Sequence, residues 1–283
     1  MKVGYLNACM KADLEEEILP WSAENGFQAM EIGGMHAAFF RKEFKEDIED
    51  IFDSTEIEIT ALGIYMNFLE GNENARRAKF TELKAKIDAA EALGISIVST
   101  HVGCNNSLNY RDNVKLFKKE WIPVINYAKE KGVKIAIENC PMQSEFALTV
   151  GNLMFTPRIM GDLFSITPSN FGLNFDPSHL IWQHVNIPLV VEEFGERIFH
   201  THAKDTKVNQ DTERFEGTFG RGIYTFRIPG KGDLDWGSYI DALKDVGYKG
   251  VLSIELEDPD YEKDLESVKT GLLESKSFLE QFI

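Results

Sequence analysis

The stretch 134-KIAIE-138 shows a design that recurs along this chain, an apolar run that ends in a side chain able to bind a cation. Three later stretches repeat it: 172-GLNFD-176, 198-IFHTH-202 and 251-VLSIE-255. Short apolar runs of this kind, bounded by turn residues, are typical of buried strands in a parallel sheet. The sequence therefore predicts at least four strands with polar side chains at their carboxyl ends.

Eight such runs, separated by helical segments, can be counted along the whole chain. Strands are predicted at residues 2–7, 28–33, 58–63, 96–102, 134–138, 172–176, 198–203 and 250–255, and the clearest helices at 73–93, 112–131 and 261–282. Gly26, Gly94, Gly132 and Gly247 fall where a helix would end before the next strand, as glycine caps do. This alternation predicts one domain over residues 1–283, an α/β fold with a helix-covered parallel sheet.

Eight βα units favour closure into a (β/α)8 TIM barrel, and no GxGxxG motif follows the first strand to suggest a dinucleotide-binding sheet. The longest irregular stretch, residues 204–236, follows the seventh strand and is predicted to be an active-site loop. Its aromatic and basic side chains either line a pocket or fold the loop onto the barrel rim. They are Arg214, Phe215, Phe219, Arg221, Tyr224 and Arg227.

The ends of strands five to eight carry the predicted chemistry, because barrel active sites lie at the carboxyl ends of the strands. Glu138, Asp176, His202 and Glu255 occupy these ends. Three converging carboxylates would repel one another unless a cation compensated them. The sequence therefore predicts one bound divalent metal ion. Oxygen-rich ligation with one imidazole suits Mn²⁺, Mg²⁺ or Co²⁺, with Zn²⁺ as a further candidate, and the ligand types do not choose among these ions.

Residues around these four ends are candidates for substrate contacts. His101 ends strand four, His179 follows Asp176 by three residues, and Lys204 shares strand parity with His202. The substrate-binding set predicted from the sequence is His179, His101, Lys204, Glu31 and Arg227. Side chains two residues below the strand ends, Ala136, Asn174, His200 and Ser253, should form the floor of the site, since alternate residues of a strand share a face. His36, His184 and Cys140 are expected to be structural.

Five motifs together resemble the xylose-isomerase-like barrel superfamily, which contains sugar isomerases, epimerases and apurinic endonucleases. They are 137-IEN-139, 174-NFDPSH-179, 200-HTHAKD-205, 229-PGKGDLDW-236 and 253-SIELE-257. The resemblance to its ketose 3-epimerases implies that Glu138, Asp176, His202 and Glu255 hold Mn²⁺ or a similar ion. It also implies that Glu138 and Glu255 act as proton acceptor and donor and that His179 contacts the substrate.

These residues predict an enzyme of carbohydrate metabolism that transfers a proton α to a carbonyl. The leading hypothesis is a metal-dependent isomerase or epimerase that acts on a sugar, sugar phosphate or inosose through a metal-stabilised enediolate. The alternative is a metal-dependent lyase or hydrolase that acts on a keto-sugar, keto-glycoside or inosose in the same site. A third hypothesis is a barrel that binds a sugar without converting it.

Composition excludes several other classes. The 30 basic and 46 acidic residues give a net charge of −16, which argues against nucleic acid as a partner. The endonuclease branch also needs a histidine at the end of strand three, where Tyr65 stands. Three cysteines without a CxxC pair, together with no long apolar run, predict a cytoplasmic protein without a membrane partner. A homo-oligomer is compatible with the sequence.

Overall fold

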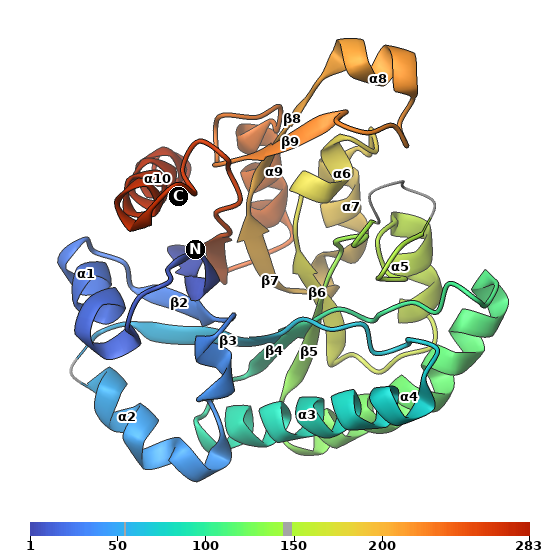
Figure 1. Cartoon of the computed structure of the whole chain (residues 1–283), viewed down its shortest axis with the longest axis horizontal. Coiled ribbons are helices and arrows are strands. Elements are labelled where there is room, and N and C mark those ends of the chain that lie inside the picture. The colour runs from blue at the N-terminus through green and yellow to red at the C-terminus, as the bar shows by residue number, and fades with distance from the viewer. Residues whose placement is uncertain (54, 144–148) are drawn as a thin grey trace.

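A closed barrel of eight parallel strands forms the centre of the computed structural model, which describes residues 1–53, 55–143 and 149–283 (Figure 1). Around the barrel the strands follow the order β1-β10-β7-β6-β5-β4-β3-β2. Their bounds are β1 Lys2–Leu6, β2 Ala29–Ile32, β3 Glu58–Ile64, β4 Ile97–Thr100, β5 Lys134–Glu138, β6 Phe171–Phe175, β7 Ile198–Ala203 and β10 Val251–Ile254. The eight strands and the α/β barrel predicted from the sequence are confirmed.

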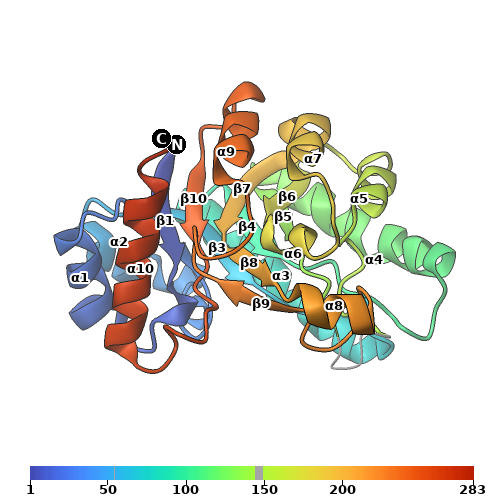
Figure 2. The same cartoon turned by 90° about the horizontal axis from the view of Figure 1, so that it is seen from above.

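Helices surround this barrel and join one strand to the next (Figure 2). They are α1 Leu19–Glu24, α2 Lys45–Asp53, α3 Glu73–Ala92, α4 Tyr110–Glu130, α5 Pro157–Phe164, α6 Ser178–Ile181, α7 Ile187–Phe194, α8 Gln210–Glu216, α9 Trp236–Asp245 and α10 Leu265–Leu279. Shorter helical turns lie at Asn7–Cys9, Leu14–Ile18, His36–Ala38, Lys42–Phe44 and Gly195–Arg197. None of the helices among the described residues has the length and apolar character needed to cross a membrane.

Capping residues at the two ends of α3 and α4 determine where these helices begin and end. Asn72 and Asn109 accept hydrogen bonds from backbone amides of the first turns of α3 and α4, which satisfies donors that a helix leaves open at its start. Gly94 and Gly132 follow the same two helices with φ of +70°, a left-handed conformation that costs glycine no steric energy. These caps explain why the predicted and observed helix ends agree closely.

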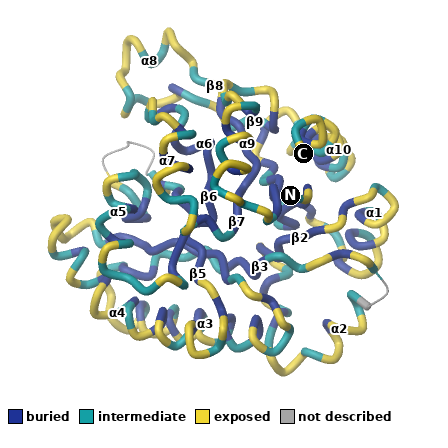
Figure 3. Tube along the Cα trace, turned by 180° about the vertical axis from the view of Figure 1, so that it is seen from behind, coloured by how far each residue is buried: buried dark blue, intermediate teal, exposed yellow. Residues whose placement is uncertain are grey.

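The barrel strands are buried, while the helices expose their outer faces (Figure 3). The pairing register of the strands determines how far along the barrel axis each functional side chain lies. Glu138 pairs with Asn174 across β5 and β6, and His202 pairs with Ser253 across β7 and β10. Asp176 and Glu255 therefore stand two residues beyond these pairing partners, at the carboxyl rim. The rim is where the predicted ligands meet.

The segment 204–236 was predicted to be irregular, and this prediction was wrong. It contains an antiparallel hairpin of β8 (Asp205–Val208) and β9 (Tyr224–Arg227), with α8 between the two strands. The buried carboxylate of Asp205 holds the segment that follows β9. It accepts hydrogen bonds from the indole of Trp236 at 2.9 Å and from the backbone amides of Gly230 and Leu234 at 3.1 and 3.0 Å. The hairpin is thus fixed against the barrel rim.

Candidate metal centre

Four predicted ligand residues meet at the carboxyl rim of the barrel. Each of Glu138, Asp176, His202 and Glu255 offers one ligand atom, and these atoms all lie within 4.8 Å of one another. The imidazole Nδ1 of His202 is 3.1 Å from Glu255 Oε2 and 3.8 Å from Glu138 Oε1. Because β5, β6, β7 and β10 are neighbours in the barrel, residues far apart in the sequence are brought to one point.

Asp176 is held in place by three hydrogen bonds, with Asn139 and Ser178, that the sequence analysis did not predict. The side-chain amide of Asn139 donates to the backbone carbonyl of Asp176 and accepts from its backbone amide, both at 2.8 Å. Asp176 Oδ1 accepts from the backbone amide of Ser178 at 2.8 Å. The second oxygen, Oδ2, is therefore the one left to face the cluster.

Glu31 lies beneath His202, with its side chain fully buried. Its Oε2 is 2.9 Å from His202 Nε2, and its Oε1 accepts a hydrogen bond of 2.7 Å from the Tyr65 hydroxyl. A carboxylate that accepts the Nε2 proton leaves Nδ1 as the free ring nitrogen of a neutral histidine. Glu31 was predicted to bind substrate, but the structure places it against a candidate ligand, outside the residues that line the cavity.

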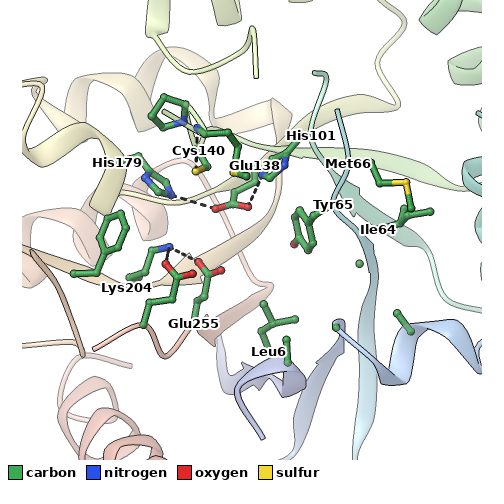
Figure 4. A pocket seen from close by; sticks show the side chains of 18 of the residues that line it. Leu6, Ile64, Tyr65, Met66, His101, Glu138, Cys140, His179, Lys204 and Glu255 are labelled. Atoms are coloured by element: carbon green, nitrogen blue, oxygen red, sulfur yellow. Dashed lines mark hydrogen bonds and ion pairs between the residues drawn. The ribbon is translucent and has the colours of Figure 1, made fainter. Parts of the chain in front are cut away.

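A cavity of about 760 Å³ adjoins two members of the cluster, Glu138 and Glu255 (Figure 4). Glu138 and Glu255 line it, as do the predicted substrate-binding residues His101, His179 and Lys204. The hairpin closes one side with Tyr224 and Phe226. A cavity of this volume is large enough for a ligand bigger than a monosaccharide.

Arg227 does not line this cavity. Its guanidinium pairs with Asp258 at 3.1 Å and with Asp260 at 2.8 Å. The predicted substrate contact of Arg227 therefore has no support from its position. Two of the aromatic residues predicted to line a pocket, Phe215 and Phe219, are instead 88% and 71% exposed. Tyr224 is the aromatic residue of that predicted set that lines the cavity.

Comparison with known proteins places this geometry in a family. A family model described as a xylose isomerase-like TIM barrel matches residues 19–281. The chain belongs to that family. The resemblance inferred from the five motifs is confirmed.

Two relatives and one solved structure of this xylose isomerase-like barrel carry informative descriptions. An inosose isomerase of Bacillus velezensis is 25% identical over 277 residues, which covers 94% of this chain and 90% of the relative. An inosose dehydratase of Clostridium perfringens is 29% identical over 145 residues, 49% of this chain and 46% of the relative, so that match spans about half of each protein. A solved structure described as IOLI protein with a binding zinc atom superposes with a TM-score of 0.77 at 23% identity, covering 100% of this chain and 99% of the other.

The electrostatics of this xylose isomerase-like site favour ionised carboxylates. Burial raises the pKa of Glu138, but hydrogen bonds from His101 and His179 outweigh it and hold the pKa well below the ordinary range. Burial also raises the pKa of Asp176, and the positive charge of Lys204 overcomes it and lowers that pKa. Both groups therefore carry negative charge at neutral pH, as ligands of a cation require.

Two buried atoms of the cluster, Asp176 Oδ2 and His202 Nδ1, make no hydrogen bond of ordinary geometry among the described residues. Each still has a close partner, since Lys204 Nζ and His179 Nε2 lie 3.1 Å from Asp176 Oδ2, and Glu255 Oε2 lies 3.1 Å from His202 Nδ1. Both atoms belong to the set within 4.8 Å, and their chemistry, carboxylate and imidazole, is that of metal ligands. The residues present fit a divalent cation.

Cationic and neutral partners complete the site. The ammonium of Lys204 lies 2.6 Å from Glu255 Oε2, 3.0 Å from Glu257 Oε2 and 3.1 Å from Asp176 Oδ2. Glu257 was not predicted, although it shares strand parity with Glu255 and could have been found by that rule. Below the cluster, burial lowers the pKa of His200 to about 4, so this histidine is neutral and hydrogen-bonds Asn174 at 3.0 Å.

Proposed function

We propose that this chain is a divalent-metal-dependent isomerase or epimerase that acts on a sugar, a sugar phosphate or an inosose by proton transfer. The observation that carries the proposal is the set of four ligand atoms within 4.8 Å of one another at the carboxyl rim of the barrel, since two glutamates of this set also line the cavity. The inosose isomerase of Bacillus velezensis, similar over 94% of this chain, supports the substrate class. A small carbohydrate is the proposed ligand, and the cytoplasm the proposed location.

Glu138, Asp176, His202 and Glu255 would hold the proposed metal ion. When bound, such a cation supplies electrophilic stabilisation of the negative charge that develops on a substrate oxygen. We propose Mn²⁺ because three carboxylates and one imidazole suit it, with Mg²⁺, Co²⁺ and Zn²⁺ as the other candidates. The zinc atom named for the solved relative is in keeping with a divalent cation in this barrel type.

The chain's own residues supply the remaining chemistry. A carboxylate close to the substrate carbon removes the proton α to the carbonyl, and a second acid returns a proton to the neighbouring carbon or to the opposite face. Glu138 and Glu255 are proposed for these roles. His101, His179 and Lys204 line the same cavity, and their nitrogen donors are proposed to orient the substrate's oxygens.

A dehydratase is the second candidate, favoured by the inosose dehydratase of Clostridium perfringens. In that reaction, the same carboxylate removes the α proton, the bond to the β-hydroxyl breaks, and a protonated group delivers a proton to the leaving oxygen so that water departs. Lys204 is suited to this last step, because its ammonium lies inside the cavity, next to Glu255 and Glu257.

Solvent exchange tests both candidates together. Protein loaded with Mn²⁺ is incubated in D₂O with a panel of ketoses, ketose phosphates and inososes, and the sugars are followed by NMR and mass spectrometry. We expect deuterium at a carbon next to the carbonyl of at least one compound, because proton removal precedes every outcome. Loss of water in addition would assign the dehydratase. Saturable binding of a sugar with no exchange across the panel would instead favour a binding protein and overturn the proposal.

Glu31 offers a second test that does not depend on knowing the substrate. We expect Glu31→Gln to weaken Mn²⁺ binding about 10- to 100-fold, because groups that orient a metal-bound histidine have effects of this size. Affinity is measured by calorimetric titration of the metal-free protein. Glu58→Gln is the matched control, since Glu58 pairs with Lys2 at the surface. Equal affinity in the parent and Glu31→Gln proteins would show that Glu31 does not position His202.

A further inference from the structure

The cavity at the carboxyl rim reaches beyond the ring of strands. Glu138 and Glu255 line it at the ends of β5 and β10, whereas Lys86 lines it from α3 and Arg41 from the segment between two short helical turns after β2. The helices of this fold surround the strands (Figure 2). The cavity therefore runs from the candidate metal ligands outwards to α3. A ligand that fills it has one end at the carboxylates and the other at Arg41 and Lys86.

The wall between these two ends is made of small or apolar residues. They are Ala37, Ala38, Gly63, Ile64 and Met66. An added Cβ at Gly63 would lie 2.9 Å from the Tyr65 ring, so glycine keeps this passage open. Figure 4 shows Ile64 and Met66 on the side of Tyr65 away from Lys204. Beyond this wall, the charged side chains that line the cavity are Arg41, Glu82 and Lys86.

Lys86 carries a buried ammonium whose charge is poorly compensated. The residue is 5% exposed, and its acceptors among the described residues are the backbone carbonyls of Ala37 and, at 3.0 Å, of Phe40. An ammonium has three N–H donors, so one remains for a ligand. Burial and the like charge of Arg41 outweigh the attraction of Glu82 and lower the pKa of Lys86 to about 8. A buried charge with only carbonyl dipoles around it is unfavourable, and an anion would relieve this cost.

Arg41 adds a second set of donors at the same end of the cavity. Its Nη2 donates to Glu82 Oε2 at 2.7 Å, and the four-residue spacing of Glu82 and Lys86 puts both on one face of α3. Two positive charges and one negative leave one positive charge here, in a chain whose net charge is −16. A guanidinium presents five N–H donors in one plane, a geometry that matches the oxygens of a phosphate or a carboxylate.

We propose that Arg41 and Lys86 bind an oxyanion, the phosphate or carboxylate group of the substrate at the end away from its carbonyl. The inference rests on the proposed function and narrows the substrate to a sugar phosphate or a sugar acid. The oxyanion accepts hydrogen bonds from both side chains and supplies the negative charge that Lys86 lacks. It also orients the substrate, because the carboxylates at the inner end repel an anion and leave the carbonyl end to face them.

Inorganic phosphate and acetate test this site without a substrate. Each is added to the metal-free, full-length protein, so that neither can bind to a metal ion, and binding is followed by NMR of the protein. We expect saturable binding of at least one anion, and the tighter of the two identifies the group that the site prefers. We expect Arg41→Gln and Lys86→Met each to weaken it about 10-fold or more, as loss of a hydrogen bond to a charged group does.

Two exposed residues of α3 provide matched controls. Arg77→Gln and Lys84→Met remove the same charges from the outer surface of that helix and should leave anion binding unchanged. Arg41 is half-buried, so Arg41→Gln tests the site even where Lys86→Met does not fold. Absence of saturable binding of either anion, or equal binding by the parent and Arg41→Gln proteins, would overturn the oxyanion site. An equal loss in the two control variants would overturn it as well, since it would indicate attraction to the overall charge.

The deuterium-exchange panel, with keto acids added, separates this inference from the proposed function. In Mn²⁺-loaded protein we expect exchange with compounds that carry a phosphate or a carboxylate. Arg41→Gln should raise the concentration for half-maximal exchange about 10-fold or more and change the maximal rate little, as loss of uniform binding does. Exchange with neutral sugars alone would overturn the oxyanion site and leave the proposed function standing. Binding of phosphate or acetate that Arg41→Gln weakens, without exchange of any compound, would support the site and overturn the proposed function.

Discussion

Replacing Glu255 or Glu138 with glutamine is expected to slow conversion of the substrate by about 10²- to 10⁴-fold, the usual contribution of a positioned acid or base. Glutamine keeps the size and one oxygen of the side chain but cannot accept a proton at neutral pH. Both carboxylates line the cavity and both belong to the candidate ligand cluster. Conversion is measured by NMR with the compound that shows exchange in the panel, at saturating Mn²⁺ and with bound metal determined in each variant.

Deuterium exchange reports on each carboxylate separately, which a loss of activity alone does not. If the two carboxylates serve opposite faces of the substrate, each variant keeps one of them. We expect either variant to stop epimerisation while the remaining carboxylate still exchanges the proton on its own face. Glu262→Gln, a change in a neighbouring carboxylate outside the ligand cluster, serves as the control. Full epimerisation in a metal-loaded Glu138→Gln or Glu255→Gln protein would contradict the assignment.

The sequence was sufficient to predict the barrel and the candidate ligands for a simple physical reason. Buried strands such as β5 and β6 must be apolar, so a carboxylate at the end of each, Glu138 and Asp176, stands out. Strands adjacent in a barrel end at the same rim, so their terminal side chains converge. The alternation of strand faces then places Asn174 and His200 below the ligands, where the structure has them hydrogen-bonded to each other.

Roles that depend on contacts between residues far apart in the sequence were harder to predict. Glu31 resembles a strand-end ligand in the sequence, but its carboxylate lies 2.9 Å from His202 Nε2 and is not among the residues that line the cavity. Arg227 lies on a hairpin whose strands are separated by α8, and short strands with such a long connection give no clear pattern. Asn139 acts through contacts with the backbone of Asp176, which no spacing of residues reveals.

Removal of the divalent metal is expected to destabilise the protein measurably, because a ligand that binds the folded state alone stabilises it in proportion to its affinity. At a Mn²⁺ concentration of about 100 times the dissociation constant, the free energy of unfolding should exceed that of the metal-free protein by about 2.7 kcal/mol. For a domain of this size, that corresponds to roughly 5 °C in the midpoint of thermal unfolding. Circular dichroism with EDTA and then with added Mn²⁺ measures it.

The physical origin of this gain is the crowding of like charges at the barrel rim. Glu138, Asp176 and Glu255 lie together with Lys204, His179 and His202 as their partners, and a divalent ion would offset the repulsion among the three carboxylates. Asp176→Ala should therefore abolish most of the increase on adding Mn²⁺. Asp260→Ala, which removes an exposed carboxylate paired with Arg227, should keep it in full. An equal increase in both variants would mean that Mn²⁺ stabilises the protein from somewhere other than this cluster.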